Sequence, residues 1–355
     1  MKSQPESIEV TIEDLAFGGD GVARVGGKAC FVPFTMPGDR CRIRIRESRK
    51  KFMRGRLVEV LKPAPGRIDP KCRVFGHCGG CQYQHMSYEA ECRFKTSQVE
   101  QTMRRLGGLD QPPMQPLISS PQPYGYRNRI QLHIEQGQVG FRAGDGRSLV
   151  AIRECPIASD TINRQIRQLQ PADLRGRIKL ALSDEGVASV GFSQVNRYQN
   201  ETLWNLIRQA FEGVGGRLIE LYAGGGFFTE VLQPQFSSIT AVEWDSRLVE
   251  RGRERCPEVE WVHQSVEDAA PGLDWKAPRL SLLVDPPREG LPSVVLGKIE
   301  ESTAEMLIYL SCNPATQARD LKLLASAWRV VSITPIDLFP RTAHIESLAV
   351  CERVR

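Results

Sequence analysis

The chain lacks long hydrophobic runs. Across its 355 residues no apolar segment approaches the roughly 18 residues that a membrane-spanning helix requires. No charged stretch followed by an apolar one opens the sequence, as a secretion signal would, and internal repeats are missing. We therefore expect a cytoplasmic protein without a membrane partner, whose ten cysteines stay reduced. Its length allows two or three domains.

Negative charge is scarce in one segment, residues 40–56, which contains nine Lys or Arg and one acid. This segment more than accounts for the formal net charge of +5. Polar and apolar residues alternate from Cys41 onwards, so a strand would present Arg42, Arg44 and Arg46 on one face. That face is a candidate phosphate-binding surface. The alternative is an edge strand whose charge prevents aggregation.

Short strand-like runs separated by glycine-rich turns surround the basic segment. They lie at residues 8–12, 21–24, 29–34 and 54–61. Such a series predicts a small β-barrel of the oligonucleotide-binding type over residues 1–64, followed by a proline-containing linker.

Four cysteines stand out in the next part of the chain. Cys72, Cys78 and Cys81 follow the pattern C-x5-C-x2-C through a glycine-rich loop, and Cys155 comes later. Four thiolates suit a structural zinc or an iron–sulfur cluster, and the spacing does not distinguish between them. Two histidines could replace a sulfur ligand, although each is more typical of the surface: His77 and His85.

The central segment, residues 65–190, also has recognisable periodicity. Helical spacing at 87–107 predicts a helix that could pack on the last segment of the chain, residues 191–355, and alternation at 126–134 and 137–141 predicts a hairpin. We expect a central α+β domain that contains the glycine-rich loop with Cys72, Cys78 and Cys81, which we call the cysteine loop.

The last segment, residues 191–355, has the pattern of an open α/β sheet. A buried strand at 217–221 runs into a glycine turn, and the strand at 239–243 ends in Glu243, which is placed to accept hydrogen bonds from a ribose. Two more strand-like runs, 280–284 and 305–310, precede Asp285 and Cys312, and a later polar loop contains Glu346.

Because the carboxyl ends of parallel strands meet at one edge of a sheet, Asp285, Cys312 and Glu346 could converge on one crevice. A cysteine there with a carboxylate nearby suggests covalent catalysis. A lone cysteine at a strand end is otherwise more often a small buried residue.

Five short motifs give the chain a resemblance to a known family. They are Phe192-Ser193-Gln194-Val195-Asn196, Leu221-Tyr222-Ala223-Gly224-Gly225-Gly226, Asp285-Pro286-Pro287-Arg288, Ser311-Cys312-Asn313-Pro314 and Thr342-Ala343-His344-Ile345-Glu346-Ser347. Together they resemble the RNA 5-methyluridine methyltransferases, which use S-adenosylmethionine. The resemblance implies a Rossmann-like class I methyltransferase domain over 191–355, a TRAM domain as the barrel and a [4Fe-4S] cluster on the four cysteines.

The resemblance also implies roles for single residues. Cys312 would add to C6 of uracil as the nucleophile, and Glu346 would remove the C5 proton as the base. The residues implied for the methyl-donor pocket are Gln194, Tyr222, Glu243 and Asp285, with Gly224 and Gly226 forming the turn. The implied substrate is structured RNA. The barrel and the cysteine cluster together favour 23S rRNA, with tRNA as the alternative.

Two departures from the family pattern keep rival functions open. The family usually has a cysteine where Ala223 stands and often an asparagine where Phe227 stands, so donor binding could differ. A non-catalytic RNA-binding relative is therefore one alternative. An amino-group methylase is another, because the Asp-Pro-Pro turn resembles one that holds an exocyclic amine. That chemistry needs no thiolate, so Cys312 favours the uridine enzyme.

Overall fold

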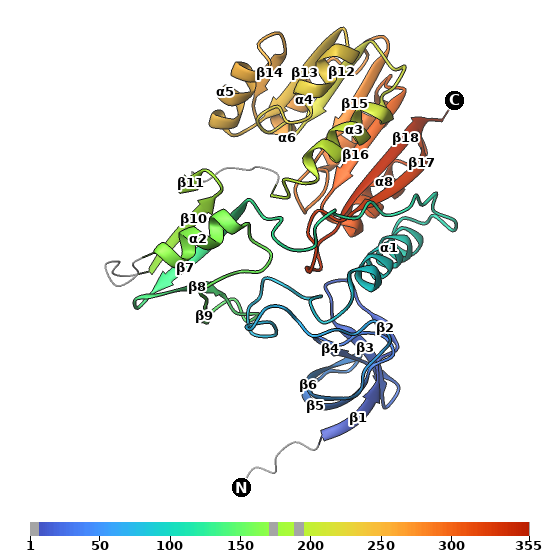
Figure 1. Cartoon of the computed structure of the whole chain (residues 1–355). Coiled ribbons are helices and arrows are strands. Elements are labelled where there is room, and N and C mark those ends of the chain that lie inside the picture. The colour runs from blue at the N-terminus through green and yellow to red at the C-terminus, as the bar shows by residue number, and fades with distance from the viewer. Residues whose placement is uncertain (1–6, 170–176, 188–194, 355) are drawn as a thin grey trace.

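Three β-sheets organise the molecule, which Figure 1 shows as three lobes. The computed structural model describes residues 7–169, 177–187 and 195–354. None of the described helices combines the length and the apolar character needed to cross a membrane.

The N-terminal sheet has six strands in the order β1-β5-β6-β4-β3-β2. Their bounds are β1 Ser7–Thr11, β2 Asp14–Leu15, β3 Gly21–Val25, β4 Lys28–Val32, β5 Arg40–Ser48 and β6 Phe52–Lys62. As the alternation in β5 predicts, Cys41 and Ile43 are fully buried in its core, while the arginines of the strand lie on the other face.

The central sheet has five strands in the order β11-β10-β7-β8-β9. Its elements are β7 Arg129–Glu135, β8 Gln138–Arg142, β9 Leu149–Ala151, α2 Asp160–Gln168, β10 Arg177–Ser183 and β11 Gly186–Val187. The predicted hairpin is β7–β8. Its turn places Gln136 and Gly137 at φ of 50° and 72°, the positive values that a tight hairpin turn requires.

The described C-terminal sheet has seven strands in the order β14-β13-β12-β15-β16-β18-β17, and β18 runs opposite to the other six. The strands are β12 Arg217–Leu221, β13 Ser238–Glu243, β14 Glu260–His263, β15 Leu280–Val284, β16 Met306–Ser311, β17 Trp328–Ile336 and β18 Glu346–Arg353. Every residue of β15 is buried, as a central parallel strand requires.

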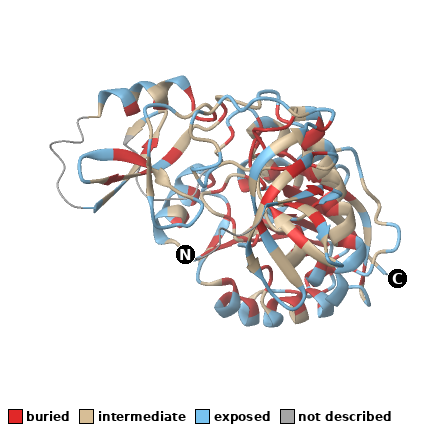
Figure 2. Cartoon of the chain, turned by 90° about the horizontal axis from the view of Figure 1, so that it is seen from below, coloured by how far each residue is buried: buried red, intermediate tan, exposed pale blue. Residues whose placement is uncertain are grey.

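Helices cover both faces of this sheet. They are α3 Asn200–Ala210, α4 Thr229–Leu232, α5 Ser246–Arg255, α6 Val266–Ala269, α7 Ser293–Glu301 and α8 Pro314–Leu323, with short 3-10 turns at Gln233–Gln235 and Ala270–Gly272. One core contains side chains of α3, α4 and α5, and the opposite core contains those of α6, α7 and α8. In Figure 2 the buried residues follow the sheets, and exposed residues follow the outer surfaces. The Rossmann-like fold class predicted from the sequence is confirmed.

The long helix α1, Tyr88–Arg105, lies outside the last sequence segment but packs on its sheet. Its Val99 and Met103 are fully buried in the core shared with α7 and α8. Ser87 caps the helix by accepting a hydrogen bond from the backbone of Ala90. The domain limits expected from the sequence stay a prediction.

Candidate active site and cysteine loop

Cys312 lies in the turn between the buried strand β16 and helix α8. Asn313 caps the helix, because its side-chain oxygen accepts a hydrogen bond from the backbone N–H of Ala315 at 3.2 Å. Pro314 takes the first helical position, where a missing N–H costs nothing. The half-buried cysteine thus stands on a rigid strand-to-helix turn.

The sheet register brings three predicted residues to one edge. Val284 of β15 pairs with Tyr309 of the parallel strand β16, so Asp285 follows its strand close to where Cys312 follows the next. Strand β18 runs the other way, with Ser347 opposite Ser311. Glu346 therefore begins its strand at the same edge. An antiparallel strand is what lets a residue late in the chain join the parallel strand ends.

Arg288 connects the turns around this edge. Its carbonyl oxygen accepts hydrogen bonds from Asn313 Nδ2 at 2.9 Å and from Thr316 Oγ1 at 3.1 Å. Its guanidinium lies 2.5 Å from Nδ1 of His344. Burial and the charge of Arg288 lower the pKa of His344 to about 4. The imidazole is therefore neutral at pH 7 and can accept the hydrogen bond.

The acids at this edge interact electrostatically. Burial, followed by Glu346 and Asp285, raises the pKa of Cys312 to about 11. Burial raises the pKa of Asp285 to about 7, and burial together with Asp285 raises the pKa of Glu346 well above its ordinary value. Arg288 opposes these shifts at Cys312 and Glu346. Perturbed groups of this kind gathered at strand ends are typical of an active site.

The glycine turn after β12 is tied to Glu243 at the end of β13. The carboxylate accepts hydrogen bonds from the backbone N–H groups of Gly224 at 3.0 Å and of Trp244 and Asp245, each at 2.9 Å. Because a carboxylate has about four acceptor sites, Glu243 can accept one more bond, such as one from a ribose hydroxyl. A Cβ on Gly224 would meet nothing within 4 Å, so the turn leaves space for a ligand.

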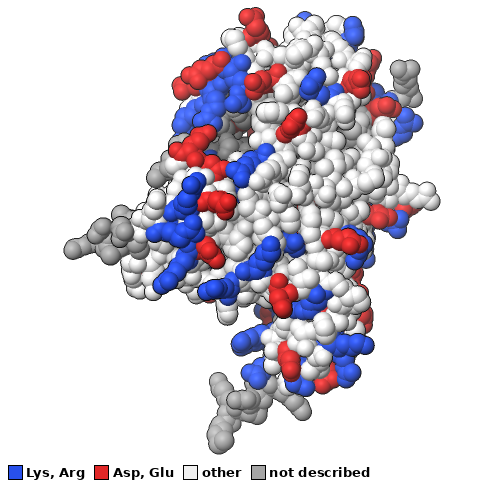
Figure 3. All heavy atoms as spheres, in the orientation of Figure 1, with Lys and Arg blue, Asp and Glu red and all other residues white. Residues whose placement is uncertain are grey.

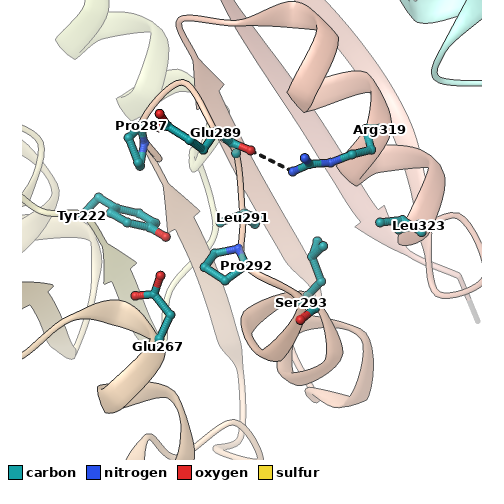
Figure 4. A pocket seen from close by; sticks show the side chains of 11 residues that line it. Tyr222, Glu267, Pro287, Glu289, Leu291, Pro292, Ser293, Arg319 and Leu323 are labelled. Atoms are coloured by element: carbon teal, nitrogen blue, oxygen red, sulfur yellow. Dashed lines mark hydrogen bonds between the residues drawn. The ribbon is translucent and has the colours of Figure 1, made fainter.

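A cavity of about 540 Å³ opens beside this turn. In Figure 4 the hydroxyl of Tyr222 points toward the carboxylate of Glu267, with Pro287 and Pro292 nearby. Tyr222 has φ of 64°, a conformation uncommon outside glycine. Glu267 was not predicted, although it follows β14, and the rule that ligands bind at the carboxyl ends of parallel strands would have pointed there.

Among the residues expected in the donor pocket, the structure brings Tyr222 to this cavity and ties Glu243 to the glycine turn. Gly226 adopts φ of 80° in the same turn. Asp285 lies at the neighbouring strand end. Gln194 lies outside the described residues.

The two departures from the family pattern are packing residues. Ala223 is 5% exposed and belongs to a hydrophobic core. The ring of Phe227 lies 5.2 Å from that of Trp204 and 4.9 Å from that of Phe228. An aromatic cluster thus supports the turn where a polar side chain was expected from the family.

The cysteine loop lies against the central sheet. The backbone N–H of Gly79 donates to the carbonyl of Arg142 at 2.9 Å. A Cβ on Gly79 would lie 3.1 Å from the carbonyl oxygen of Ala143, which leaves little room for a side chain. Beyond the sheet, Asn163 holds Cys155 by accepting from its N–H at 2.8 Å and donating to its carbonyl at 3.0 Å.

The four cysteines predicted as ligands are free and influence one another. Burial, followed by Cys155, Cys78 and Cys72, raises the pKa of Cys81 to about 12. Burial and Cys72 likewise raise the pKa of Cys155, to about 11. Within the residues that the structure describes, however, no group of three or more His, Cys, Asp or Glu is arranged to hold a metal ion.

The prediction that His85 lies at the surface is wrong. Its side chain is 1% exposed, and its ring lies 5.7 Å from that of Phe75. His77 is exposed. The neighbours of His85, Tyr83 and Met86, are fully buried in one cluster with Leu15 and Met36 of the N-terminal domain, so the segment around His85 packs on that domain.

The arginine face of β5 is less uniformly positive than its sequence suggests. Arg42 forms ion pairs with Glu59 at 2.7 Å and Glu9 at 3.5 Å, which lie on the two neighbouring strands. Arg44 lies opposite Arg56, and neither has an ion-pair partner among the described residues; Arg46 is exposed. Figure 3 shows positive and negative side chains intermixed on the visible face of the barrel, at the bottom of the view.

Comparisons with known proteins agree with this architecture. Residues 5–58 match the TRAM domain, and residues 275–354 match the tRNA (Uracil-5-)-methyltransferase family. An uncharacterized RNA methyltransferase of Bdellovibrio bacteriovorus is 31% identical, over 96% of this chain and 94% of that protein. The chain belongs to the RNA uracil-C5 methyltransferase family.

Two further relatives of this uracil-C5 methyltransferase are informative. The 23S rRNA (uracil(1939)-C(5))-methyltransferase RlmD of Photorhabdus laumondii is 28% identical, over 98% of this chain and 96% of that protein. The crystal structure of the Pyrococcus abyssi tRNA (uracil-54, C5)-methyltransferase in complex with S-adenosyl-L-homocysteine has a TM-score of 0.74 at 21% identity. It covers 97% of this chain and 100% of that chain, and it supports the fold.

Proposed function

We propose that the protein transfers a methyl group from S-adenosylmethionine to C5 of a uridine in 23S rRNA. The observation that carries this proposal is the convergence of Cys312, Asp285 and Glu346 at one sheet edge, next to the glycine turn. A half-buried thiol among carboxyl groups suits covalent catalysis on a base brought out of its stack.

Cys312 acts as the nucleophile. Uracil C5 is too poor a nucleophile to take a methyl group directly. Addition of a thiolate to C6 produces an enolate whose C5 can attack the methyl group of S-adenosylmethionine. The pKa of about 11 means that the resting thiol must first lose its proton. Arg288, which lowers this pKa, lies where its charge favours the thiolate.

Glu346 acts after methyl transfer. It removes the C5 proton, the electron pair restores the C5–C6 double bond, and the C6–S bond breaks to release Cys312. The raised pKa of Glu346 makes the carboxylate a stronger base than an exposed one. It must be deprotonated at that step, and Arg288 favours the deprotonated form.

S-adenosylmethionine supplies an electrophilic methyl group on a sulfonium centre. The residues present fit it: Glu243 retains one acceptor site, Gly224 leaves open space, and the adjoining cavity reaches Tyr222. Asp285 follows β15, which lies between β12 with its glycine turn and β16 with Cys312. Gln194 is proposed to complete the pocket.

Relatives support 23S rRNA as the substrate. RlmD proteins of Photorhabdus laumondii and Vibrio vulnificus, whose names specify a 23S rRNA uracil, match at least 98% of this chain. The barrel at residues 5–58 would add RNA contacts, with Arg44 and Arg46 available for phosphates and Arg42 partly neutralised. A tRNA substrate is the alternative.

We also propose that Cys72, Cys78, Cys81 and Cys155 hold a [4Fe-4S] cluster. Their support is chemical: the four thiols are free, and Cys72, Cys78 and Cys155 lie close enough to Cys81 to raise its pKa, while Gly79 allows the loop of the first three to approach the sheet. Anaerobic purification should yield about four iron and four acid-labile sulfide per chain. Stoichiometric zinc without sulfide would contradict the proposal.

The test of function uses the purified protein, S-adenosylmethionine labelled in its methyl group, and deproteinised 23S rRNA or bulk tRNA in separate reactions. Label in 5-methyluridine from 23S rRNA alone is the expected result. Label from tRNA alone would identify the alternative substrate. Label in a methylated exocyclic amine would contradict the uracil-C5 chemistry.

A further inference from the structure

The loop that leads to Glu346 depends on the rest of the molecule for its shape. Residues 337–345 connect β17 to β18 and include His344; we call them the base loop. Arg341 has φ of 69°, a conformation that persists in a non-glycine residue only where the surroundings impose it. The contacts that hold the base loop therefore determine the position of Glu346, the first residue of β18.

Helix α1 holds the first half of the base loop. Lys95 Nζ donates to Asp337 Oδ1 at 2.8 Å and to the carbonyl of Phe339 at 3.2 Å. Glu91 Oε1 accepts from the backbone N–H of Arg341 at 2.7 Å. Both α1 side chains are fully buried, so these contacts fix the loop against a rigid element.

The cysteine loop holds the second half, through Gln82. The backbone N–H of Gln82 donates to the carbonyl of Arg341 at 3.0 Å. The side-chain Oε1 of Gln82 accepts from the N–H of Ala343 at 3.0 Å, and its Nε2 donates to the carbonyl of Gly79 at 3.0 Å. One side chain, adjacent to Cys81 in sequence, thus bridges the cysteine loop and the base loop.

We infer that Gln82 is a positioning residue for Glu346, which links the cysteine loop to the step that removes the C5 proton. This inference rests on the proposed function. Because Glu346 acts only after methyl transfer, a displaced base loop should delay release of methylated RNA from Cys312 more than it delays transfer itself. Small displacements of a reacting group are costly, since proton transfer requires hydrogen-bond distance.

The test is Gln82→Leu in the full-length protein, with two readouts. Hydrogen–deuterium exchange at the base loop should accelerate by about fivefold at Ala343, whose N–H loses its acceptor. In a reaction with methyl-labelled S-adenosylmethionine and RNA, the share of label that migrates with protein under denaturing conditions should rise by roughly tenfold.

Two further variants make the result specific. Gln82→Glu keeps an acceptor for Ala343 and should restore both readouts toward those of the unmodified protein. Gln101→Leu is the matched control, because its side chain bonds only to Ser97 within α1 in the described structure. It should change neither readout.

Two outcomes would overturn the inference. One is slower methylation by Gln82→Leu without faster exchange or more protein-bound label, and the other is an equal effect of Gln101→Leu. If the unmodified protein methylates no RNA, the proposed function fails. The exchange measurement then still decides whether Gln82 positions the base loop.

Discussion

Two clusters of ionisable side chains adjoin the base loop, and they differ in charge balance. The anchor cluster contains two cations, Lys95 and Arg341, and two acids, Glu91 and Asp337, all buried. The catalytic cluster contains three acids, Cys312, Asp285 and Glu346, near the cation Arg288.

The difference in balance produces different chemistry. Burial alone would lower the pKa of Lys95, but Asp337 and Glu91 raise it, so the lysine stays charged and holds the loop. In the catalytic cluster burial raises the pKa of all three acids, and neighbouring acids add to the rise at Cys312 and Glu346, so protons remain available for transfer. The paired charges of the anchor cluster hold the base loop in place, whereas the raised pKa values of the catalytic cluster keep protonated groups at the site.

The largest effect should come from removing the nucleophile. We expect Cys312→Ala to lower methyl transfer by roughly four or more orders of magnitude, because no other group can form the C6 adduct. Protein-bound RNA should disappear as well. Labelled methyl transfer and denaturing electrophoresis measure the two effects.

Cys92→Ala is the matched control for that experiment. Cys92 is also half-buried, and burial together with Asp337 and Glu91 of the anchor cluster raises its pKa to about 11. Activity should remain within a fewfold of the unmodified protein. Substantial methylation by Cys312→Ala would instead favour amino-group chemistry.

The next effect concerns the anchor cluster. Lys95→Met leaves two buried carboxylates without their shared cation, and we expect a loss of about 3–5 kcal/mol of stability. Thermal unfolding and exchange at the base loop measure it. Neutralising the acids as well, with Glu91→Gln and Asp337→Asn, should recover part of the loss.

Lys322→Met provides the control, since this lysine is exposed on α8. Its effect should stay within about 0.5 kcal/mol. Equal losses from both lysine variants would show that the buried ion pairs do not hold the base loop.

The sequence predicted the catalytic cluster better than the anchor cluster, for a physical reason. Asp285 and Cys312 each follow an apolar strand, and the carboxyl ends of parallel strands meet by rule. Glu346 was expected at the same crevice from a later polar loop, and the motif resemblance added its role as the base. The antiparallel direction of β18, which brings Glu346 to that edge, was not predicted.

The anchor cluster was invisible because its partners are distant in sequence. Lys95 and Asp337 are separated by 242 positions, and a lysine on a helix is ordinarily solvated. The same limit explains His85, whose burial depends on packing between the barrel and the cysteine loop. Local periodicity identifies elements but does not identify which distant side chains meet.

The reactivity of Cys312 and Cys92, one cysteine at each cluster, also distinguishes the two clusters. Since Cys312 and Cys92 have pKa values of about 11, alkylation of each should accelerate by about tenfold per pH unit between roughly pH 7 and 10. Arg288→Met should slow alkylation of Cys312, because it removes the charge that lowers that pKa, and should leave Cys92 unchanged. Quantitative mass spectrometry of the two peptides measures both rates. A plateau for Cys312 near neutral pH would contradict the assigned surroundings.

The smallest effect concerns Glu220, a further buried acid that interacts with Asp285 of the catalytic cluster. Glu220 of β12 is 2% exposed, and burial, with a contribution from Asp285, raises its pKa to about 8. The folded protein then keeps a proton that the unfolded chain loses above about pH 4.5. The stability that this proton provides is complete below that pH and is lost as pH rises toward 8.

Glu220→Gln cannot ionise and keeps an oxygen that can accept the hydrogen bond from Thr229. We expect this variant to be more stable than the unmodified protein at pH 8, by on the order of 2 kcal/mol, with the advantage shrinking as pH falls toward 5. Thermal unfolding at several pH values measures this trend, and Glu212→Gln on an exposed turn serves as the control. If the stability advantage of Glu220→Gln did not change with pH, it would come from packing rather than from the bound proton. The raised pKa of Glu220 would then be contradicted.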